Sequence, residues 1–468
     1  MRRSGRPTPD ARLAVALLAA WAATAHAGEW PSFRGPGASG VADGQGLPVD
    51  WEVRTGRNVR FKAKVPGLGH SSPVVWGDRI FVTTAVGASA EAPLVLGDEG
   101  GIGLAPDGGT LSWRLYCLSA DDGRVLWNTE AFSGRPRAKR HVKSSQANAT
   151  PATDGRTIVG LFGSEGAAGF DWSGKLLWKA DLGVMNPGLL GDATSEWGHA
   201  SSPVLADDRV FVQVDRHEGS FLTALDLASG RRLWTVARDE RPVWATPLHH
   251  EVGGRKELVV VGGQYVRAYD PRDGRELWRF KDEAEVKTPS PFVAGGLVVL
   301  AGGYRGRPLY ALKAGASGDV SVPEGATGGP FLAWRTEPGG PYTSTPLAYR
   351  DRLYAVRDEG IFTAYDLKTG ALLYRERTGA THSASPVASD RRVFLAAEGG
   401  EVLVLGTGDA FEVLSRNDMG EPVFATPAIA RGTLYVRTRG HLYAIALPAG
   451  RAAVAPTMNP RRHVRGGT

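Results

Sequence analysis

The sequence predicts an all-β fold, an eight-bladed β-propeller with four antiparallel strands in each blade. A repeat of about 40 to 50 residues that holds four short strands is the signature of that architecture. One sequence motif recurs eight times along the 468 residues. Each copy opens with a small hydroxyl residue and proline, and the clearest copies close with Asp-x-x-x-Gly-x-x-Leu-Trp, as residues 201–203 and 226–234 do. The 62 glycines are about twice the usual share, which suits a chain crowded with tight turns.

The opening of each repeat predicts the innermost strand of a blade, because proline at the first residue of a strand costs no ladder hydrogen bond. The second strand is rich in β-branched and aromatic residues, as at 209–212, and the third strand, as at 221–226, alternates. An Asp and a Gly then form the turn that leads to the outer strand. The eight openings lie at Pro73, Pro151, Pro203, Pro247, Pro291, Pro346, Pro386 and Pro427.

The eighth repeat lacks an outer strand, since it stops after residues 442–445. An orphan strand at 58–63 precedes the first repeat, with Phe61 in the place of the closing Trp. We therefore expect the N-terminal strand to complete the last blade. Such closure buries the sheet edges that an open array would expose.

The outer strands end in aromatic residues that resemble the tryptophan-docking motif of the pyrroloquinoline-quinone (PQQ) enzyme propellers. In that family the Trp of one blade packs on the next blade. The resemblance covers roughly residues 30–447, and a large ring beside a tight Gly turn suits such packing. The expected docking residues are Trp127, Trp178, Trp234, Trp278, Trp334 and Tyr374.

Two further segments restrict the resemblance to a smaller group of proteins among these propellers. Residues 30–36 read Trp-Pro-Ser-Phe-Arg-Gly-Pro, and residues 67–78 read Gly-Leu-Gly-His-Ser-Ser-Pro-Val-Val-Trp-Gly-Asp. They look like the exported PQQ-like-repeat proteins, many of which are named for the outer-membrane assembly factor BamB. Trp30 and Phe33 are interpreted as an apolar strap across the propeller rim, and a binding role is the alternative.

The N-terminus predicts a Sec-type export signal over residues 1–27. Four arginines precede an apolar run at 13–25, and the run ends in an Ala-x-Ala cleavage pattern at 25–27. The mature chain would begin at Gly28 in the periplasm or outside the cell. Because no cysteine lies near the cleavage site, we expect no lipid anchor.

The mature chain divides into a strap at 28–57, the propeller at 58–449 and a basic, disordered tail at 450–468. The net charge of +6 comes from four arginines in the signal and four in the tail, so the body is close to neutral. We therefore expect no nucleic-acid surface. No apolar run reaches the roughly 18 residues of a transmembrane helix. Cys117, the single cysteine, takes the inward place of Ala224 and Ala268 and is expected to be a buried small hydrophobe.

Candidate site residues come from two sets of loops that emerge on one face of the propeller. One set enters the inner strands and the other joins the second strands to the third, and both should ring one mouth of the channel. Insertions at 85–112, 133–145 and 181–198 belong to the same face and could form a lid or a partner surface. Each residue could instead bond its own framework. The first set is His70, Asn148, His199, Trp244, Lys287, Tyr342, His382 and Phe424, and the second is Glu165, Asp215, Gln264, Glu359, Glu398 and Arg437.

Two functions remain open from the sequence. The first is a non-catalytic platform that binds a protein, a peptide or an envelope component on this face, as a monomer without cofactor or metal. The second is a PQQ-dependent oxidoreductase with a calcium ion. The resemblance disfavours the second, because the family's alcohol dehydrogenases carry an adjacent-cysteine disulfide over the cofactor and this chain has one cysteine. No segment matches their Asp base or calcium ligands, and no His-Glu-x-x-His or cysteine pair predicts a metal site.

Overall fold

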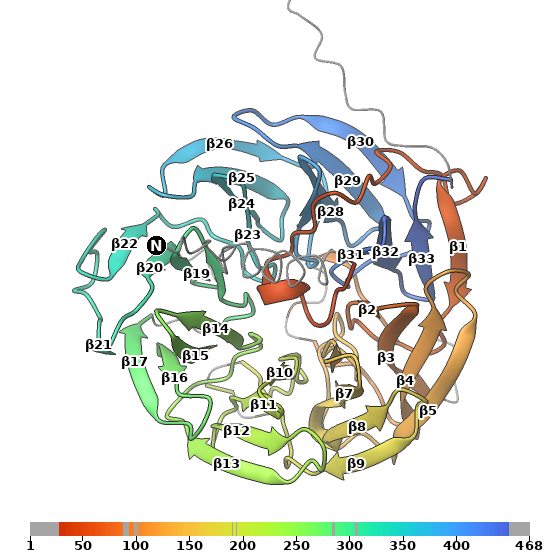
Figure 1. Ribbon diagram of the computed structural model, residues 1–468, viewed down its shortest axis with the longest axis horizontal. Coiled ribbons are helices and arrows are strands. Elements are labelled where there is room, and N and C mark those ends of the chain that lie inside the picture. Colours follow the sequence, from red (N-terminus) through yellow and green to blue (C-terminus); the bar gives the residue numbers. More distant parts are fainter. Residues whose placement is uncertain are drawn as a thin grey trace, which may run out of the picture.

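The structure, a computed structural model, describes residues 28–87, 93–97, 101, 103–189, 191–192, 194–282, 286–304 and 308–448. Over these residues the chain forms eight sheets in a ring around a central axis (Figure 1). Seven sheets have four strands and one has five. The predicted all-β, eight-bladed propeller is therefore confirmed. The predicted signal, 1–27, and basic tail, 450–468, lie outside the described residues.

Blades one to four follow one another along the chain, each from its innermost to its outermost strand. Blade one holds β2 (Val74–Trp76), β3 (Arg79–Gly87), β4 (Leu111–Ser119) and β5 (Val125–Gly134). Blade two holds β6 (Ala152–Thr153), β7 (Thr157–Leu161), β8 (Ala167–Asp171) and β9 (Leu176–Ala180). Blade three holds β10 (Val204–Ala206), β11 (Arg209–Val214), β12 (Phe221–Asp226) and β13 (Arg232–Ala237). Blade four holds β14 (Leu248–Val252), β15 (Arg255–Val261), β16 (Tyr265–Tyr269) and β17 (Glu276–Lys281), with β21 (Gly318–Asp319) added in parallel.

Blades five to eight complete the ring in the same order. Blade five holds β18 (Phe292–Ala294), β19 (Leu297–Ala301), β20 (Leu309–Lys313) and β22 (Leu332–Arg335). Blade six holds β23 (Leu347–Tyr349), β24 (Arg352–Val356), β25 (Ile361–Asp366) and β26 (Leu372–Arg377). Blade seven holds β27 (Val387–Ser389), β28 (Arg392–Ala396), β29 (Glu401–Gly406) and β30 (Val413–Asp418). Blade eight holds β31 (Ala428–Ala430), β32 (Thr433–Arg437), β33 (His441–Ile445) and β1 (Val59–Lys64). Two 3-10 turns, η1 (Pro36–Ala38) and η3 (Gly163–Glu165), are also present.

The ring closes as expected, through the N-terminal strand. Strand β1 pairs antiparallel with β33, with Ala63 opposite Leu442 and Phe61 opposite Ala444. The strand nearest the start of the described chain thus lies beside the strand nearest its end, and the last blade gains its missing outer edge (Figure 1).

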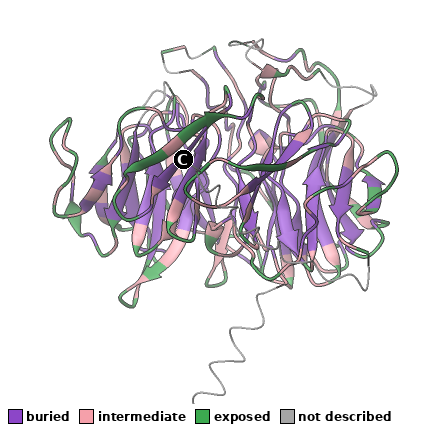
Figure 2. Cartoon of the chain, turned by 90° about the horizontal axis from the view of Figure 1, so that it is seen from above, coloured by how far each residue is buried: buried purple, intermediate pink, exposed green. Residues whose placement is uncertain are grey.

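The middle strands of each blade are buried on both faces. The four central residues of β12 are all buried, although the sequence suggested alternation there. The reason is that each blade packs face to face between two neighbours, so no face of a middle strand meets solvent. Outer strands such as β13 stay partly exposed. Figure 2 accordingly shows buried residues within the blades and exposed residues at loops and outer edges.

Four of the six predicted docking aromatics form a hydrogen bond with the next blade. Each of these indole N–H groups donates to a carbonyl in the following blade's turn over 2.9 to 3.3 Å, from Trp127 to Trp172, Trp178 to Leu227, Trp234 to Pro271 and Trp334 to Leu367. The rings of three of them also cover that turn's glycine so closely that a Cβ there would lie 2.4 to 2.7 Å from an indole atom, at Gly174, Gly230 and Gly370.

Two predicted docking residues differ from this pattern. Trp278 donates instead to Glu257 of its own blade, over 2.9 Å, because the insertion after β20 pairs β21 with β17 where the next blade's turn would lie. Tyr374 packs against Phe411 of blade seven, with ring centroids 6.4 Å apart. Blade seven is the blade whose closing sequence motif is degenerate. Cys117 lies fully buried opposite Trp127, as expected, and burial raises the pKa of its thiol to about 12.

The strap crosses the centre of the ring instead of following its rim (Figure 1). It starts at blade one, where Trp30 and Val75 exchange two backbone hydrogen bonds of 2.8 and 2.9 Å. It then reaches blade seven, where Ala388 donates to the Gly40 carbonyl over 2.8 Å. The strap therefore ties blades one and seven, which are not neighbours in the ring, together on one face.

Arg34 anchors the strap at the axis. Its side chain is fully buried, and its guanidinium donates to Thr345 and Pro346 of blade six and to Pro386 of blade seven, over 3.2, 2.8 and 3.4 Å. It also caps the strap's own turn through the carbonyl of Ala38, over 3.1 Å. Burial among carbonyls lowers the pKa of Arg34 to about 9.

Replacing Arg34 with methionine is expected to lower the free energy of unfolding by about 2–3 kcal/mol, because several buried carbonyls lose their donor. Removing a buried cation offsets part of that loss. Chemical denaturation followed by tryptophan fluorescence measures the effect. Arg54→Met, in the same segment but with a side chain 87% exposed, is the control and should change stability by less than about 0.5 kcal/mol. Equal losses in the two variants would refute the anchoring role.

Candidate functional site

A cavity of about 550 Å³ lies on the propeller axis, and residues from all eight blades line it. It has the dimensions of a small-ligand pocket. A floor, a ring of hydroxyls, an aromatic wall and a charged rim can be distinguished from the floor upward.

The hydroxyl belt is the ring of Ser and Thr side chains that precede the proline of each inner strand. Its members are Ser72, Thr150, Ser202, Thr246, Ser290, Thr345, Ser385 and Thr426, and all of them line the cavity. At seven consecutive junctions the backbone N–H of one member donates to the side-chain oxygen of the member in the next blade, over 2.9 to 3.0 Å. The hydroxyl group of the Ser or Thr that opens each repeat therefore joins neighbouring blades around the axis.

The strap supplies the floor of this cavity. Phe33 lines it together with the belt. The same residue lines a second cavity, of about 460 Å³, on the strap side. The sequence assigned Phe33 to the rim, and the structure corrects that assignment, because the strap crosses the axis and Phe33 separates the two cavities.

Aromatic rings form the wall in pairs. Two pairs are near-parallel stacks and the third is tilted, so their flat faces and edges line much of the space above the belt. The pairs and their centroid separations are His70 and Phe424 at 4.8 Å, Trp197 and Trp244 at 5.9 Å, and Tyr304 and Tyr342 at 5.1 Å.

The insertions reach over the mouth and are held there by Glu398. This carboxylate of blade seven is fully buried and accepts the backbone N–H of Gly97 over 2.7 Å and the ammonium of Lys143 over 2.8 Å. Both donors belong to insertions of blade one, and both residues line the cavity. The Ser383 hydroxyl also donates to Glu398. The ion pair therefore binds the insertions of blade one to blade seven at the mouth.

A second buried ion pair stiffens the same insertions. Arg140 donates to both carboxylate oxygens of Asp107 over 2.7 and 2.9 Å and to the Ser144 carbonyl over 2.6 Å. The guanidinium is 1% exposed, and such bidentate pairs hold a defined geometry. The insertions are thus built as a fixed cover in the region that the structure describes.

The charges that line the cavity are nearly balanced. Burial, with the charges of Arg437 and Arg140, lowers the pKa of His70 to about 3, so this ring is neutral. Burial raises the pKa of Asp358 to about 6, against two hydrogen bonds from Thr343 that favour its charged form. The cation Lys143 faces Glu398, and Arg357 contacts Glu359 at 2.5 Å.

The structure brings six of the predicted site residues together. His70, Asn148, Trp244, Tyr342 and Glu359 line the axial cavity, and so does Phe424. The two loop sets therefore meet at one mouth, as their strand order predicts. Whether these residues bind a ligand stays a prediction.

Two predicted histidines serve the framework of their own blades and do not line the cavity. His199 is buried, with Nε2 3.1 Å from the Gln213 carbonyl, and burial lowers its pKa to about 4. His382 is fully buried, with Nδ1 2.9 Å from the Ala396 carbonyl and Nε2 2.8 Å from the Thr378 hydroxyl. Both imidazoles bond the framework, and a ligand role for them stays a prediction.

Arg437 and Glu165 also lie outside the cavity lining. Arg437 is buried and donates to the carbonyls of Ser71 and Thr83 over 3.0 and 2.8 Å, which joins blade eight to blade one. Glu165 accepts the backbone N–H of Arg137 over 2.9 Å, and partial burial raises its pKa. These polar groups stabilise contacts between chain segments, and a site role for either residue stays a prediction.

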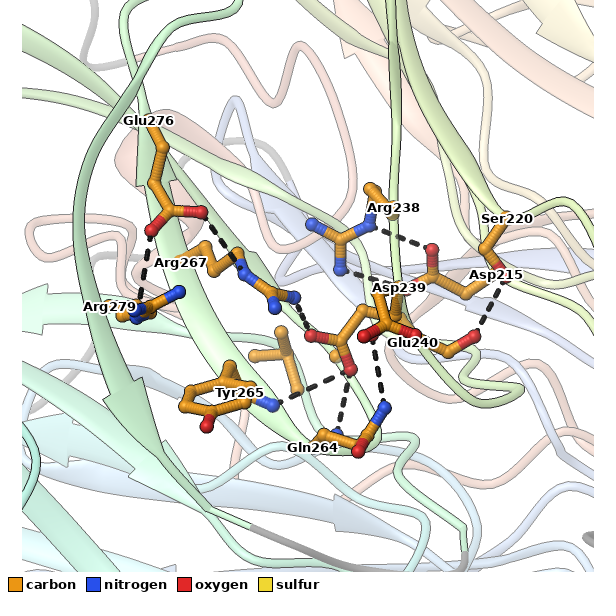
Figure 3. Close-up of polar contacts among 12 residues, drawn as sticks. Asp215, Ser220, Arg238, Asp239, Glu240, Gln264, Tyr265, Arg267, Glu276 and Arg279 are labelled. Carbon is orange, nitrogen blue, oxygen red and sulfur yellow. Dashed lines mark hydrogen bonds and ion pairs between the residues drawn. The ribbon is translucent and has the colours of Figure 1, made fainter. Parts of the chain in front are cut away.

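Asp215 belongs to a buried ion pair within blade three (Figure 3). Its two oxygens accept Nε and Nη2 of Arg238 over 2.8 and 2.9 Å, and both side chains are 0% exposed. Arg238 further donates to the Tyr269 hydroxyl over 2.8 Å. Asp215 therefore bonds the framework, and the site role predicted for it stays a prediction.

Gln264 and Lys287, also considered from the sequence, make framework contacts nearby. The Gln264 backbone donates to Glu240 over 2.7 Å, beside the ion pair of Glu240 with Arg267 that Figure 3 shows. Lys287 is fully buried, with Nζ 3.0 Å from an Asp282 oxygen.

Several lining residues were missed by sequence reasoning. Lys143 and Trp197 lie in insertions that the sequence marked only as segments, and Tyr304 and Asp358 lie in loops between second and third strands, where the loop position was the available signal. Insertions carry no repeat register, so their side chains could not be placed from the repeat pattern.

No group of three or more His, Cys, Asp or Glu side chains suited to a metal ion forms among the described residues. Within the same residues, no helix has the length and apolar character needed to cross a membrane.

The chain matches the family model described as outer membrane protein assembly factor BamB through four overlapping segments, residues 19–212, 114–264, 218–321 and 262–459. Curated relatives match over shorter stretches. Tetrathionate hydrolase of Acidithiobacillus ferrooxidans is 22% identical over 284 residues, which are 56% of this chain and 47% of that protein. Quinoprotein ethanol dehydrogenase of Pseudomonas aeruginosa is 32% identical over 81 residues, which are 17% of this chain and 12% of that protein. The chain thus aligns with about half of the first relative and about an eighth of the second.

Solved structures share the fold at low identity. BamB from Moraxella catarrhalis is 14% identical, with 83% of this chain and 99% of that chain covered and a TM-score of 0.55. The quinohemoprotein alcohol dehydrogenase from Comamonas testosteroni is 12% identical, with 92% and 82% covered and a TM-score of 0.63. At such identities the likeness concerns the fold alone, and that fold is shared by a BamB protein and by an alcohol dehydrogenase.

Proposed function

The chain belongs to the family of β-propellers described by outer membrane protein assembly factor BamB, and from this premise we propose that it is an exported, monomeric, non-catalytic binding protein. Its ligand or a partner's segment enters the axial cavity from the face that carries the insertions. The periplasm or the extracellular space is the proposed compartment.

The composition of the cavity carries this proposal. Its stacked aromatic rings and its hydroxyl belt offer contact surface, while its charged groups already have partners. Lys143 is paired with Glu398, Arg357 with Glu359, and the Asp358 carboxylate accepts both hydrogen bonds from Thr343. Apolar walls with few oriented polar groups are typical of ligand pockets.

The alternative is a PQQ-dependent oxidoreductase, and one observation favours it. Asp358 has a pKa raised to about 6 at the cavity wall, as a proton acceptor near neutral pH would need. The lining residues do not fit the cofactor, however. PQQ carries three carboxylates and needs a cation beside its carbonyl. Lys143 and Arg357 are already bound to carboxylates, and the lining carboxyl groups of Asp358 and Glu359 do not converge with others into a cation-binding group among the described residues.

Titration with PQQ and calcium tests the two functions against each other. We expect no quenching of tryptophan fluorescence at micromolar PQQ, and no turnover in dye-linked assays of alcohols and sugars or in assays of tetrathionate. Micromolar binding with turnover would replace the binding proposal by the enzymatic one.

The binding role itself is tested by native mass spectrometry of protein purified from its periplasm. Bound material should be present on the wild type and lost from Trp197→Ala, whose side chain lines the axial cavity. Trp76→Ala is the matched control, because Trp76 lines the cavity on the strap side. Equal loading of all three proteins would contradict binding in the axial cavity.

A further inference from the structure

We propose that the axial cavity binds one or two rings of a neutral saccharide. This inference rests on the proposed function, that the cavity is a binding site, and names the chemical class of its ligand. Three observations carry it: the flat aromatic wall, the unused hydrogen-bonding groups and the balance of charge.

The wall suits a ring with apolar faces. Phe33 closes the cavity from below, and the Trp197–Trp244 and His70–Phe424 stacks present ring surfaces at its sides. Saccharide rings have C–H faces and hydroxyl edges, so they can stack on aromatic rings while the edges meet polar groups. Trp and Tyr combine an apolar body with a polar handle and suit such mixed contacts.

The hydroxyl belt supplies donors that the protein leaves unused. Seven belt oxygens accept a hydrogen bond from the backbone N–H group of the neighbouring blade. Among the described residues, the O–H groups of these seven side chains donate no hydrogen bond to a protein acceptor. Nε2 of His70 and the indole N–H of Trp197 are likewise buried without a partner among the described residues. An apolar ligand would leave these groups unsatisfied, which is costly, whereas a ligand rich in hydroxyl groups satisfies them.

The charges at the rim favour a neutral ligand. Lys143 and Arg357 would repel a cation, and Asp358 and Glu359 would repel an anion. The side-chain nitrogen and oxygen atoms of these four residues can still form hydrogen bonds that orient the hydroxyl groups of a sugar. The volume of about 550 Å³ lies in the range of small-ligand pockets, roughly 300–1,000 Å³, and accommodates one or two sugar rings rather than a folded segment.

Isothermal titration with a panel of disaccharides tests the inference on the mature protein. The neutral probes are cellobiose, maltose and N,N′-diacetylchitobiose, and the charged counterparts of equal size are cellobiuronate and deacetylated chitobiose. We expect at least one neutral probe to bind with a dissociation constant below about 1 mM, and at least tenfold more tightly than either charged probe.

Two variants locate the binding. Trp197→Ala should weaken binding at least tenfold, and Thr150→Val, which removes one belt hydroxyl and keeps the side-chain shape, should weaken it severalfold. Trp76→Ala on the strap side should leave it unchanged. Circular dichroism of each variant verifies the fold. Should Thr150→Val fail to fold, Trp197→Ala alone decides, because its side chain is partly exposed in an insertion.

The outcomes separate this inference from the proposed function. If no neutral saccharide binds, or if Trp197→Ala binds the sugar as well as the wild type, the saccharide assignment is wrong. In that case material retained in native mass spectrometry would still support a binding role. Binding of PQQ with turnover would overturn the proposed function and this inference together.

Discussion

Replacing Trp178 with alanine is expected to lower the free energy of unfolding by about 3–5 kcal/mol, because a buried aromatic side chain leaves a cavity that the rigid blades cannot fill. The ring is 7% exposed and lies between two glycines, Gly169 of its own blade and Gly230 of the next. Its indole N–H also donates to the Leu227 carbonyl over 2.9 Å, and that buried acceptor would lose its donor. Urea denaturation of the mature protein measures the loss.

A double-mutant cycle with Gly230→Ala shows whether this loss comes from docking between blades. A Cβ on Gly230 would lie 2.4 Å from the Trp178 ring, at a backbone φ of 68°. Gly230→Ala alone should therefore cost more than 1 kcal/mol, and clearly less in the Trp178→Ala background, because the clash is gone. Trp234→Ala, with a ring that is only partly buried, should cost less than Trp178→Ala. Additive losses would mean that the ring and the glycine turn are not coupled.

Replacing Asp215 with asparagine is expected to cost about 3–5 kcal/mol, because it leaves the Arg238 guanidinium buried without a counter-charge. Both side chains are 0% exposed. Although the variant loses the carboxylate that raises the pKa of Arg238, the ordinary pKa of an arginine is so far above 7 that the guanidinium keeps its charge. Thermal and chemical denaturation at pH 7 measure the loss.

The control for this prediction is Asp207→Asn, which removes an exposed ion pair with Lys256 and should cost no more than about 0.5 kcal/mol. The double variant Asp215→Leu with Arg238→Met should recover most of the loss, since no buried charge remains unpaired. If Asp215→Asn is as mild as Asp207→Asn, the buried pair does not stabilise the fold.

The repeat pattern predicted the architecture because each blade is a local unit. The Pro that opens a blade, the Asp-Gly turn and the closing aromatic lie within one repeat, so their spacing determines the hairpins and the blade count. The ring closure followed from counting strands, since the eighth repeat lacked the one that residues 58–63 supply. Trp278 departs from the docking pattern because an insertion in the next blade replaces the turn that it would meet.

The candidate site was predicted only in part. Strand order placed His70, Asn148 and Tyr342 on one mouth, and the structure brings them to one cavity. The loops that hold Asp215, His199 and His382 lie on the same face, yet those side chains bond the framework. A loop position determines which face a residue belongs to, but its side-chain direction depends on which buried acceptor lies within reach.

By itself, the sequence determined the eight blades, the inward place of Cys117 and the closing role of the N-terminal strand, since each depends on contacts within a repeat or on the number of strands. Only the tertiary structure decided what occupies the axis. Arg34 reaches carbonyls more than 300 residues away in the chain, and Glu398 binds Gly97 and Lys143 across the mouth. Contacts between segments so distant in sequence leave no local periodicity, because burial and hydrogen bonding select them only after the ring has closed.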